Sequence, residues 1–162
     1  MNPVSELLGV EDIELDLDVS GKEALLTRIA AMLARRDRLV AVDVFESLAA
    51  RERLGSTALG HGVAIPHARM PQCVAASAVF VRTRTGIAFD APDGRPVSVF
   101  LGLIVPNQAN DRHLKLLATA AGMFSDRAFR EKLRASRDSA AVVELFAAWR
   151  DPAAVQPRDS AG

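Results

Sequence analysis

The side chains best suited to carry chemistry in this sequence are its three histidines, His61, His67 and His113. A neutral imidazole has one nucleophilic nitrogen while its other nitrogen carries the proton, so histidine suits reversible phosphoryl transfer near neutral pH. A phosphohistidine also needs its new charge neutralised and its ring oriented. Arginine, a second imidazole and backbone N–H groups can do this.

His67 follows a short predicted strand at 63–65 and comes directly after Pro66. Proline lacks a backbone N–H, so it ends a strand or confines it to a sheet edge. We therefore expect the imidazole of His67 at the end of a strand, in a concave site rather than in the core. The competing interpretation is an ordinary histidine of a surface loop, and residue type alone does not separate the two.

His113 comes soon after Asn110 and Asp111, either of which can cap a helix, and is expected in the first helical turn. The positive end of the helix dipole disfavours imidazolium there. A neutral His113 can donate a hydrogen bond to a phosphoryl oxygen on His67. The alternative is a residue that starts the helix and has no further role.

Arg51 and Arg53 lie in the last turn of a predicted helix that Gly55 would end as a left-handed cap. Cations are favoured at helix C-termini on electrostatic grounds alone, but one of these arginines can also clamp an anion beside the glycine-rich segment that follows. In that segment, Ser56 and Thr57 can offer hydroxyl or amide groups to a phosphate, or serve as turn residues. The segment is not a P-loop, because it lacks the GK[ST] ending.

A zinc site is a second interpretation of the same histidines. His61 and His67 are six residues apart, so they share a face if the chain between them is extended, and His113 would supply a third ligand. No local metal spacing is present, and we expect no bound metal. Cys73 is the single cysteine, which excludes an intrachain disulfide and fits a reducing compartment.

The N-terminal part of the sequence predicts a strand followed by two helices. Residues 12–19 alternate between apolar and polar, mostly acidic, side chains, as in a half-buried strand. An amphipathic helix is predicted at about 21–36, started by a capping box of Ser20 and Glu23. A second helix is predicted at about 42–54. Its inward face is expected to comprise Val42, Phe45, Leu48 and Ala49.

The middle of the sequence predicts the centre of a sheet. Continuous apolar runs at 74–82 and 96–105 are typical of strands covered on both faces. Between them we expect a short strand at 86–89 and a turn at Asp93–Gly94.

The last third is predicted to be helical. One helix should start at Asn110 or Asp111, a second at Ser125, and a third should follow. The first is expected to bury Leu114, Leu117, Ala118, Ala121 and Phe124. The third is expected to bury Val142, Val143, Phe146 and Trp149. The order of elements implies an α/β fold, a mixed sheet flanked by helices, in one domain at 1–150, with a disordered tail at 151–162.

The composition fits one globular domain and excludes some partners. The 162 residues are 49% hydrophobic and 25% charged, which is ordinary for a chain that buries a core. Lysine plus arginine equals aspartate plus glutamate at 20 each, so no basic excess points to nucleic acid or an anionic membrane. The acidic N-terminus does not resemble a signal peptide, and the longest apolar run, 97–105, is too short to span a bilayer. A cytoplasmic protein is expected.

Residues 51–69, RERLGSTALGHGVAIPHAR, resemble the active-site signature of the fructose/mannitol-type and nitrogen-related enzyme IIA family of the bacterial phosphotransferase system. The family pattern has R-E, then G-S-T, then G-x-G-[IV]-A-[IV]-P-H. A second block, a histidine and a leucine one turn after V-P, is matched by VPNQANDRHLKLLA at 105–118. The FD-x-x-D-x-x-P-V turn is matched at 89–97, and the whole resemblance covers about residues 5–150.

The resemblance implies a mixed sheet flanked by helices and a phosphohistidine carrier without a bound cofactor. His67 matches the phosphorylated histidine, which would accept a phosphoryl group from a phospho-HPr-like carrier protein. His113 matches the second active-site histidine, which assists without being phosphorylated. Arg51 matches the active-site arginine, and Ser56 and Thr57 match the residues that shape the pocket.

His61 departs from the family pattern, because relatives often have asparagine or an acid six residues before the phosphorylated histidine. A third imidazole at this position would add positive charge to the phosphoryl pocket at low pH, or simply occupy its rim.

Two roles within the family are open. The chain is expected to be a lone module, and SGKEALL (20–26) and DRHLKLLATAAGMFSD (111–126) look more like the nitrogen-related branch. In that branch, regulatory partners such as potassium-transport or sensor-kinase proteins sense the phosphorylation state. The alternative is a sugar-specific IIA that passes its phosphoryl group to a IIB component for sugar uptake, and an operon with IIB and IIC genes would favour it. A binding protein that has lost transfer is disfavoured by the presence of His67 and Arg51.

Overall fold

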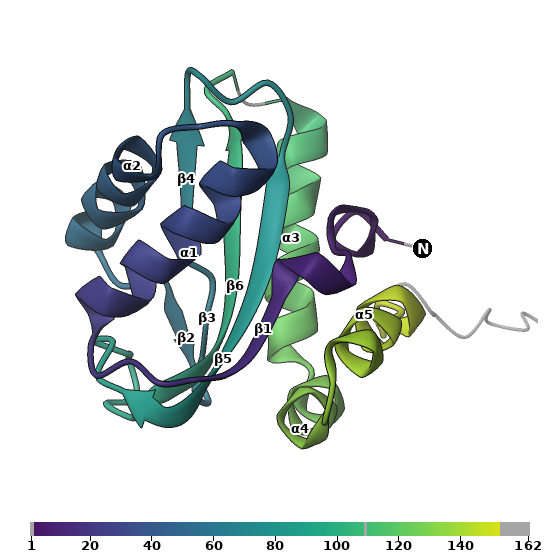
Figure 1. The fold of residues 1–162 in the computed structure, drawn as a ribbon. Coiled ribbons are helices and arrows are strands. Elements are labelled where there is room, and N and C mark those ends of the chain that lie inside the picture. Colours follow the sequence, from purple (N-terminus) through teal and green to yellow (C-terminus); the bar gives the residue numbers. More distant parts are fainter. Residues whose placement is uncertain (1, 109, 153–162) are drawn as a thin grey trace, which may run out of the picture.

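Residues 2–108 and 110–152 are described by the computed structural model, in which a mixed sheet lies between two layers of helices (Figure 1). Within these residues, six strands form one sheet: β1 (Ile13–Leu17), β2 (Ala58–Gly60), β3 (Val63–Ala64), β4 (His67–Met70), β5 (Ser77–Ile87) and β6 (Val97–Pro106). The helices are α1 (Lys22–Asp37), α2 (Ala41–Leu54), α3 (Asp111–Ser125), α4 (Arg127–Ala135) and α5 (Ser139–Ala148). Two short 3-10 turns, η1 (Ser5–Leu7) and η2 (Val10–Asp12), precede them. The predicted α/β class is confirmed.

The sheet is built around the antiparallel pair of β5 and β6. The strand order is β1-β5-β6-β3-β2, and β4 pairs with the same edge of β6 as β3 does. β1 runs parallel to β5, β3 and β4 run parallel to β6, and β2 runs antiparallel to β3. Val63 pairs with Val99 and His67 with Leu103, so β3 and β4 are successive parts of one edge. Pro66 lies in the gap between them, where its missing N–H costs no ladder hydrogen bond.

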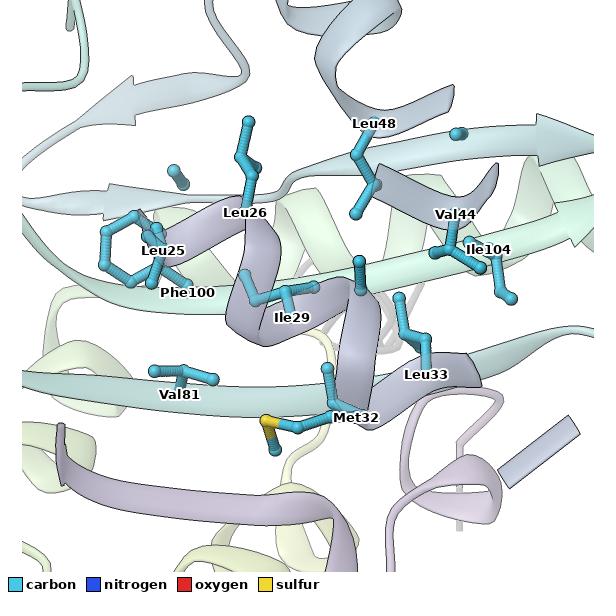
Figure 2. Close-up of a cluster of buried hydrophobic side chains, with 14 of the residues drawn as sticks. Leu25, Leu26, Ile29, Met32, Leu33, Val44, Leu48, Val81, Phe100 and Ile104 are labelled. Atoms are coloured by element: carbon cyan, nitrogen blue, oxygen red, sulfur yellow. The ribbon is translucent and has the colours of Figure 1, made fainter. Parts of the chain in front are cut away.

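Helices α1 and α2 cover one face of the sheet, as Figure 2 shows in detail. Leu25, Ile29 and Leu33 of α1 are fully buried against strand residues such as Phe100 and Ile104. Gly102 in β6 permits this close approach, because a Cβ at that position would lie 2.6 Å from Cγ2 of Ile29. The absence of a side chain on β6 therefore sets how near α1 can pack.

Helices α3, α4 and α5 cover the opposite face with a second buried cluster (Figure 1). Phe146 of α5 makes edge-on ring contacts with Phe80 of β5 and Phe129 of α4, at centroid distances of 5.7 and 5.1 Å. Phe129 also contacts Trp149 at 6.4 Å. Aromatic pairs in this geometry add to the stabilisation from their buried area. They fix the last two helices to the sheet.

Two predicted details of the first two helices are wrong. Helix α1 has Gly21 as its N-cap, without a side-chain hydrogen bond, so the capping box of Ser20 and Glu23 is not formed. In α2, Val42 is 63% exposed, whereas Val44 and Leu48 are fully buried. The buried stripe is displaced because it continues through the charged Glu52, which an apolar pattern does not reveal.

The strand at 12–19 is shorter than predicted and is interrupted. Asp16 has a φ of 56°, and the register between β1 and β5 shifts between Glu14 and Leu17. Gly55 has φ 155° and ψ 145°, which is not the predicted left-handed helical cap but is still a region open mainly to glycine.

The connection between the two central strands also differs from the prediction. Both strands are present, but β5 continues to Ile87, so the separate strand at 86–89 does not form. Residues 88–96 form the connecting loop, and the N–H of Gly94 donates to the carbonyl of Ala91 at 2.9 Å. The Asp93–Gly94 turn is thus present, inside a longer loop.

The C-terminal helices have their predicted order, and the predicted cap at Asn110 and the predicted burial of Val142, Phe146 and Trp149 are confirmed. The buried face of α3 and the start of α4 differ from the prediction. Leu114 is 55% exposed, and the buried residues of α3 are Leu116, Ala120, Met123 and Phe124. The buried face of α3 was predicted wrongly because apolar residues occur on both sides of this helix, so the sequence is compatible with two different apolar stripes. Helix α4 is capped by Asp126, not Ser125.

The predicted disordered tail lies mostly outside the described residues, since 153–162 are not among them. Trp149, the last buried residue of the described part, is only 9% exposed. No helix in residues 2–108 or 110–152 is long and apolar enough to cross a membrane.

Candidate functional site

His67 is the first residue of β4, and it pairs with Leu103 of β6. Ala68 and Met70 point into the core beneath α1 and α2. Because side chains alternate along a strand, His67 and Arg69 face the opposite side, which is the side of α3. Pro66 separates β3 from β4 and accepts a hydrogen bond from the N–H of Leu103 at 2.9 Å, so the pairing with β6 resumes at His67, whose imidazole is half-buried.

The ring of His67 is held by one short hydrogen bond. Its Nδ1 lies 2.7 Å from the carbonyl oxygen of Ile65. A carbonyl can only accept, so Nδ1 must carry the proton, and Nε2 then has the free lone pair. No described residue bonds Nε2, and it is not among the buried nitrogens that lack a partner. The nucleophilic nitrogen therefore remains open to an incoming group.

The surroundings of His67 keep its ring neutral. Burial lowers its pKa below the ordinary 6.5, and this desolvation outweighs the hydrogen bond to Ile65, which acts in the opposite direction. The positive charges of Arg51 and Arg69 lower the pKa further, while Glu52 raises it. A neutral imidazole at pH 7 is the form that can act as a nucleophile.

Arg51 ends α2 beside the glycine-rich segment. Its Nη1 donates to the carbonyl of Gly55 at 2.8 Å, which fixes the guanidinium over the exit of the helix. Its positive charge lowers the pKa of His67, although burial of the ring has the larger effect. The structure thus places Arg51 where its charge acts on the imidazole of His67.

Glu52 is a buried carboxylate that connects the end of α2 to its neighbours. It is 7% exposed and accepts hydrogen bonds from the backbone N–H of Thr57, at 3.1 Å, and from the Thr57 hydroxyl. Lys22 at the start of α1 forms an ion pair with it at 2.9 Å and lies 4.5 Å from the ring centroid of Phe89. Glu52 therefore joins two helices to the loop that precedes β2.

Sequence reasoning did not single out Glu52 or Lys22. The signal was present, because Glu52 is the acid of the R-E pair at the start of the signature and Lys22 lies in SGKEALL.

The hydroxyls of Ser56 and Thr57 are both engaged within the loop. Ser56 donates to the carbonyl of Phe89 at 2.6 Å and accepts from the N–H of Ala58 at 3.1 Å. Thr57 is buried and donates to Glu52. These side chains shape the loop and tie it to the turn at 89–97, rather than projecting free donors outward.

His113 lies in the first turn of α3, where its backbone N–H donates to Oδ1 of Asn110 at 3.1 Å. The cap is therefore Asn110. His113 helps to line a hollow of about 780 Å³ together with Pro106, Arg112 and Lys115. Its Nδ1 is buried and has no hydrogen-bond partner among the described residues. His113 lies on the same side of the sheet as His67, but no hydrogen bond joins the two rings in the described structure.

His61 is placed apart from His67. It is exposed in the turn between β2 and β3, with a φ of 57°, and its N–H donates to Asp93 at 2.9 Å. Gly62, the next residue after His61, accepts a hydrogen bond from the N–H of Ser98, whereas His67 pairs with Leu103. Ser98 and Leu103 are five residues apart along β6, which corresponds to about 16 Å along the strand. Within residues 2–108 and 110–152, no group of three or more His, Cys, Asp or Glu side chains is arranged to hold a metal.

Comparison with known proteins connects this geometry to one family. The model of the phosphoenolpyruvate-dependent sugar phosphotransferase system, EIIA 2, matches residues 6–149. A nitrogen regulatory protein from Bradyrhizobium diazoefficiens is 39% identical over 145 residues, 90% of this chain and 95% of the relative.

Solved structures agree. The crystal structure of nitrogen regulatory protein IIA-Ntr from Neisseria meningitidis superimposes with a TM-score of 0.85 and 43% identity, over 88% of this chain and 98% of that one. Enzyme IIA for mannitol from Escherichia coli, solved in complex with phosphorylated IIB, shares the fold with a TM-score of 0.74 and 22% identity, over 86% of this chain and 96% of that one.

Proposed function

The chain belongs to the EIIA type-2 family of the phosphoenolpyruvate-dependent sugar phosphotransferase system, and from this we propose that it is a phosphohistidine carrier with His67 as its acceptor. One observation supports the choice of His67, and of its Nε2, as the acceptor. The Nδ1–H of His67 is bonded to Ile65 at 2.7 Å, which leaves Nε2 neutral, unbonded and available.

The transfer is a displacement between two histidines. The lone pair of His67 Nε2 attacks the phosphorus held by a phospho-HPr-like carrier, the donor's P–N bond breaks, and the donor imidazole leaves. No net proton transfer to His67 is needed, because its Nδ1 keeps its proton throughout. The carbonyl of Ile65 then faces the positive charge that the phosphorylated ring acquires. Positioning and electrostatics supply most of the catalysis in such a step.

The positive charges near His67 would stabilise its phosphorylated form. A phosphohistidine carries about two negative charges on its phosphoryl oxygens. Arg51 and Arg69, whose charges already lower the pKa of His67, would stabilise those oxygens. Glu52 holds the segment beside Arg51 in place through Thr57 and Lys22 without projecting its own charge into solvent.

His113 is the assisting imidazole in this proposal. It stands in the first turn of a 15-residue helix, on the face of the sheet to which His67 points. Its Nδ1 lacks a partner among the described residues. A phosphoryl group on His67 would supply an acceptor for a ring N–H of His113 once the two are brought into contact.

We assign the regulatory, nitrogen-related role first, because the relative from Bradyrhizobium and the structure from Neisseria are both named nitrogen regulatory proteins and lie at 39% and 43% identity. In that role a cytoplasmic carrier presents its phosphorylation state to protein targets, such as potassium-transport proteins or sensor kinases. The alternative, a sugar-specific IIA that serves a IIB component, is supported by the shared mannitol IIA fold. Transfer from the phosphorylated protein to a fructose- or mannitol-type IIB would favour the alternative.

The test is intact-mass measurement after incubation with phosphoenolpyruvate, enzyme I and an HPr-type carrier. We expect one acid-labile phosphoryl group on the wild type and none on His67→Ala. His61→Ala is the matched control, since it removes an exposed imidazole about 16 Å away along the strand, and it should be labelled like the wild type. Normal labelling of His67→Ala would refute the proposal.

A further inference from the structure

Four arginines surround a hollow of about 390 Å³. The lining residues come from the β2–β3 turn, the β5–β6 loop and α4, which Figure 1 shows at one end of the sheet. They are Arg95 of the β5–β6 loop and Arg127, Arg130 and Arg134 of α4. His61, Gly62, Pro96 and Glu131 complete the lining. This arginine hollow is remote from His67, and the carrier function does not use it.

The positive charge of the arginine hollow is poorly compensated. The whole chain has zero formal net charge, but four arginines here face one lining carboxylate. Glu131 pairs with Arg127 at 3.1 Å, and the other three arginines have no ion pair among the described residues. The carboxylate of Asp93 lies nearby, accepts from the backbone N–H groups of His61 and Arg95, and interacts with the charge of Arg95, which helps to lower its pKa. Even with Asp93 and Glu131 counted, the four arginines leave an excess of two positive charges here.

The arginines repel one another in this arrangement. The pKa of Arg134 is lowered, first by burial and then by the charge of Arg130, and Glu131 only partly offsets this. Like charges held together in a partly buried place cost free energy unless a counter-ion joins them.

Two of the guanidinium groups are fixed in place. Arg130 is 7% exposed and its Nη1 donates to the carbonyl of Phe124 at 3.0 Å. Arg134 donates through Nη2 to the carbonyl of His61. Each guanidinium has five N–H donors, so most donors have no protein acceptor in the described structure. Arg134 is exposed, and within the described residues no other nitrogen of the buried Arg130 is both enclosed and without a partner; both side chains line the hollow.

We propose that the arginine hollow is a binding site for the diphosphate group of a small anion. Guanidinium forks bind phosphate oxygens in pairs, and two forks already held by backbone carbonyls lose little entropy on binding. The volume lies in the range of small-ligand sites. Convergence of four arginines on one small hollow suits a compact, multiply charged group better than an extended acidic peptide.

The test uses inorganic pyrophosphate as the probe on the full chain, followed by amide NMR and calorimetry. We expect saturable shifts confined to residues 61–62, 95 and 127–134. The double variant Arg95→Gln/Arg127→Gln should weaken binding at least tenfold, because it removes two charged donors. Arg35→Gln/Arg38→Gln removes the same charge from exposed positions at the end of α1 and should bind like the wild type.

Two competition experiments distinguish a diphosphate ligand from other anions. A nucleoside 5′-diphosphate should compete with pyrophosphate, whereas sulfate at the same concentration should not. Shifts elsewhere in the chain, equal binding of sulfate, or equal losses in both double variants would overturn the proposal. Arg95 and Arg127 are exposed, so the variant should keep a dispersed NMR spectrum, and labelling of His67 should be unchanged in it.

Discussion

The acceptor histidine bonds a backbone carbonyl rather than a carboxylate, and this decides its chemistry. A carboxylate partner would favour imidazolium and raise the pKa of the ring. The carbonyl of Ile65 fixes the same tautomer with a weaker effect, so burial prevails and the pKa of His67 is lowered. The ring is therefore both oriented and neutral.

This balance predicts a pH dependence. The pKa of His67, followed by NMR of the ring protons, should lie below 6.5, and Arg51→Gln should raise it because a positive charge is removed. Arg53→Gln is the control, since Arg53 is exposed and is not among the charges that act on His67. An unchanged pKa in Arg51→Gln would show that Arg51 does not act on the imidazole.

The same lowered pKa affects stability. Between the folded pKa and 6.5, the unfolded chain binds more protons at His67, so this residue's contribution to the free energy of unfolding is complete above about pH 6.5 and is lost as pH falls through the folded pKa. Urea unfolding at several pH values should show this loss in the wild type and a smaller one in His67→Gln. Identical pH dependence in the two proteins would contradict it.

His113 should affect the rate of transfer and leave the acceptor in place. His113→Ala removes a donor expected to meet the phosphoryl oxygens, so phosphorylation should slow by about tenfold to a hundredfold and still reach one group per chain. Quenched-flow labelling measures the rate. A full rate in His113→Ala, or no labelling at all, would remove His113 from its assisting role.

At the scale of elements, Glu52 joins the start of α1, the end of α2 and the loop to β2. Glu52→Ala leaves Lys22 and Thr57 without their partner and should lower the free energy of unfolding by about 2–4 kcal/mol. Arg53→Ala, one residue further along the same helix but exposed, should change it by no more than about 0.5 kcal/mol. Equal effects in urea unfolding would mean that the network does not join these elements.

The contact between α1 and β6 depends on Gly102. Gly102→Ala should lower the free energy of unfolding by about 1–3 kcal/mol, because the new methyl group meets Ile29 at 2.6 Å and Val79 at 3.1 Å. A double-mutant cycle with Ile29→Ala checks the cause. The cost of Gly102→Ala should shrink when Ile29 is already alanine, and additive costs would place the strain elsewhere.

In the whole molecule, the sequence predicted the mixed sheet, its central strands and the break in the strand at Pro66, but not that His67 begins a further strand, β4. The predicted features are encoded locally, in apolar runs and in Pro66. It could not predict that Glu52 is buried, because a charged residue at the end of a helix looks exposed until its partners Lys22 and Thr57 are known. His61 was predicted beside the site because of its spacing, whereas the β2–β3 turn places it at the other end of β3.

Trp149 is the last buried residue of the described part of the chain, and its ring N–H donates to Asp126 at 3.1 Å. The contacts that hold the last helices therefore precede the predicted tail. Ending the chain after residue 152 should change the free energy of unfolding by no more than about 0.5 kcal/mol, as measured in urea. A larger loss would mean that the tail is part of the folded structure.

The central claim, that Nε2 of His67 receives the phosphoryl group, is tested most directly by NMR of the phosphorylated protein with ¹⁵N-labelled histidine. We expect a ³¹P–¹⁵N coupling to Nε2 of His67, with Nδ1 still protonated and donating to the carbonyl of Ile65. Coupling to Nδ1 of His67, or to either of the other two histidines, would contradict it.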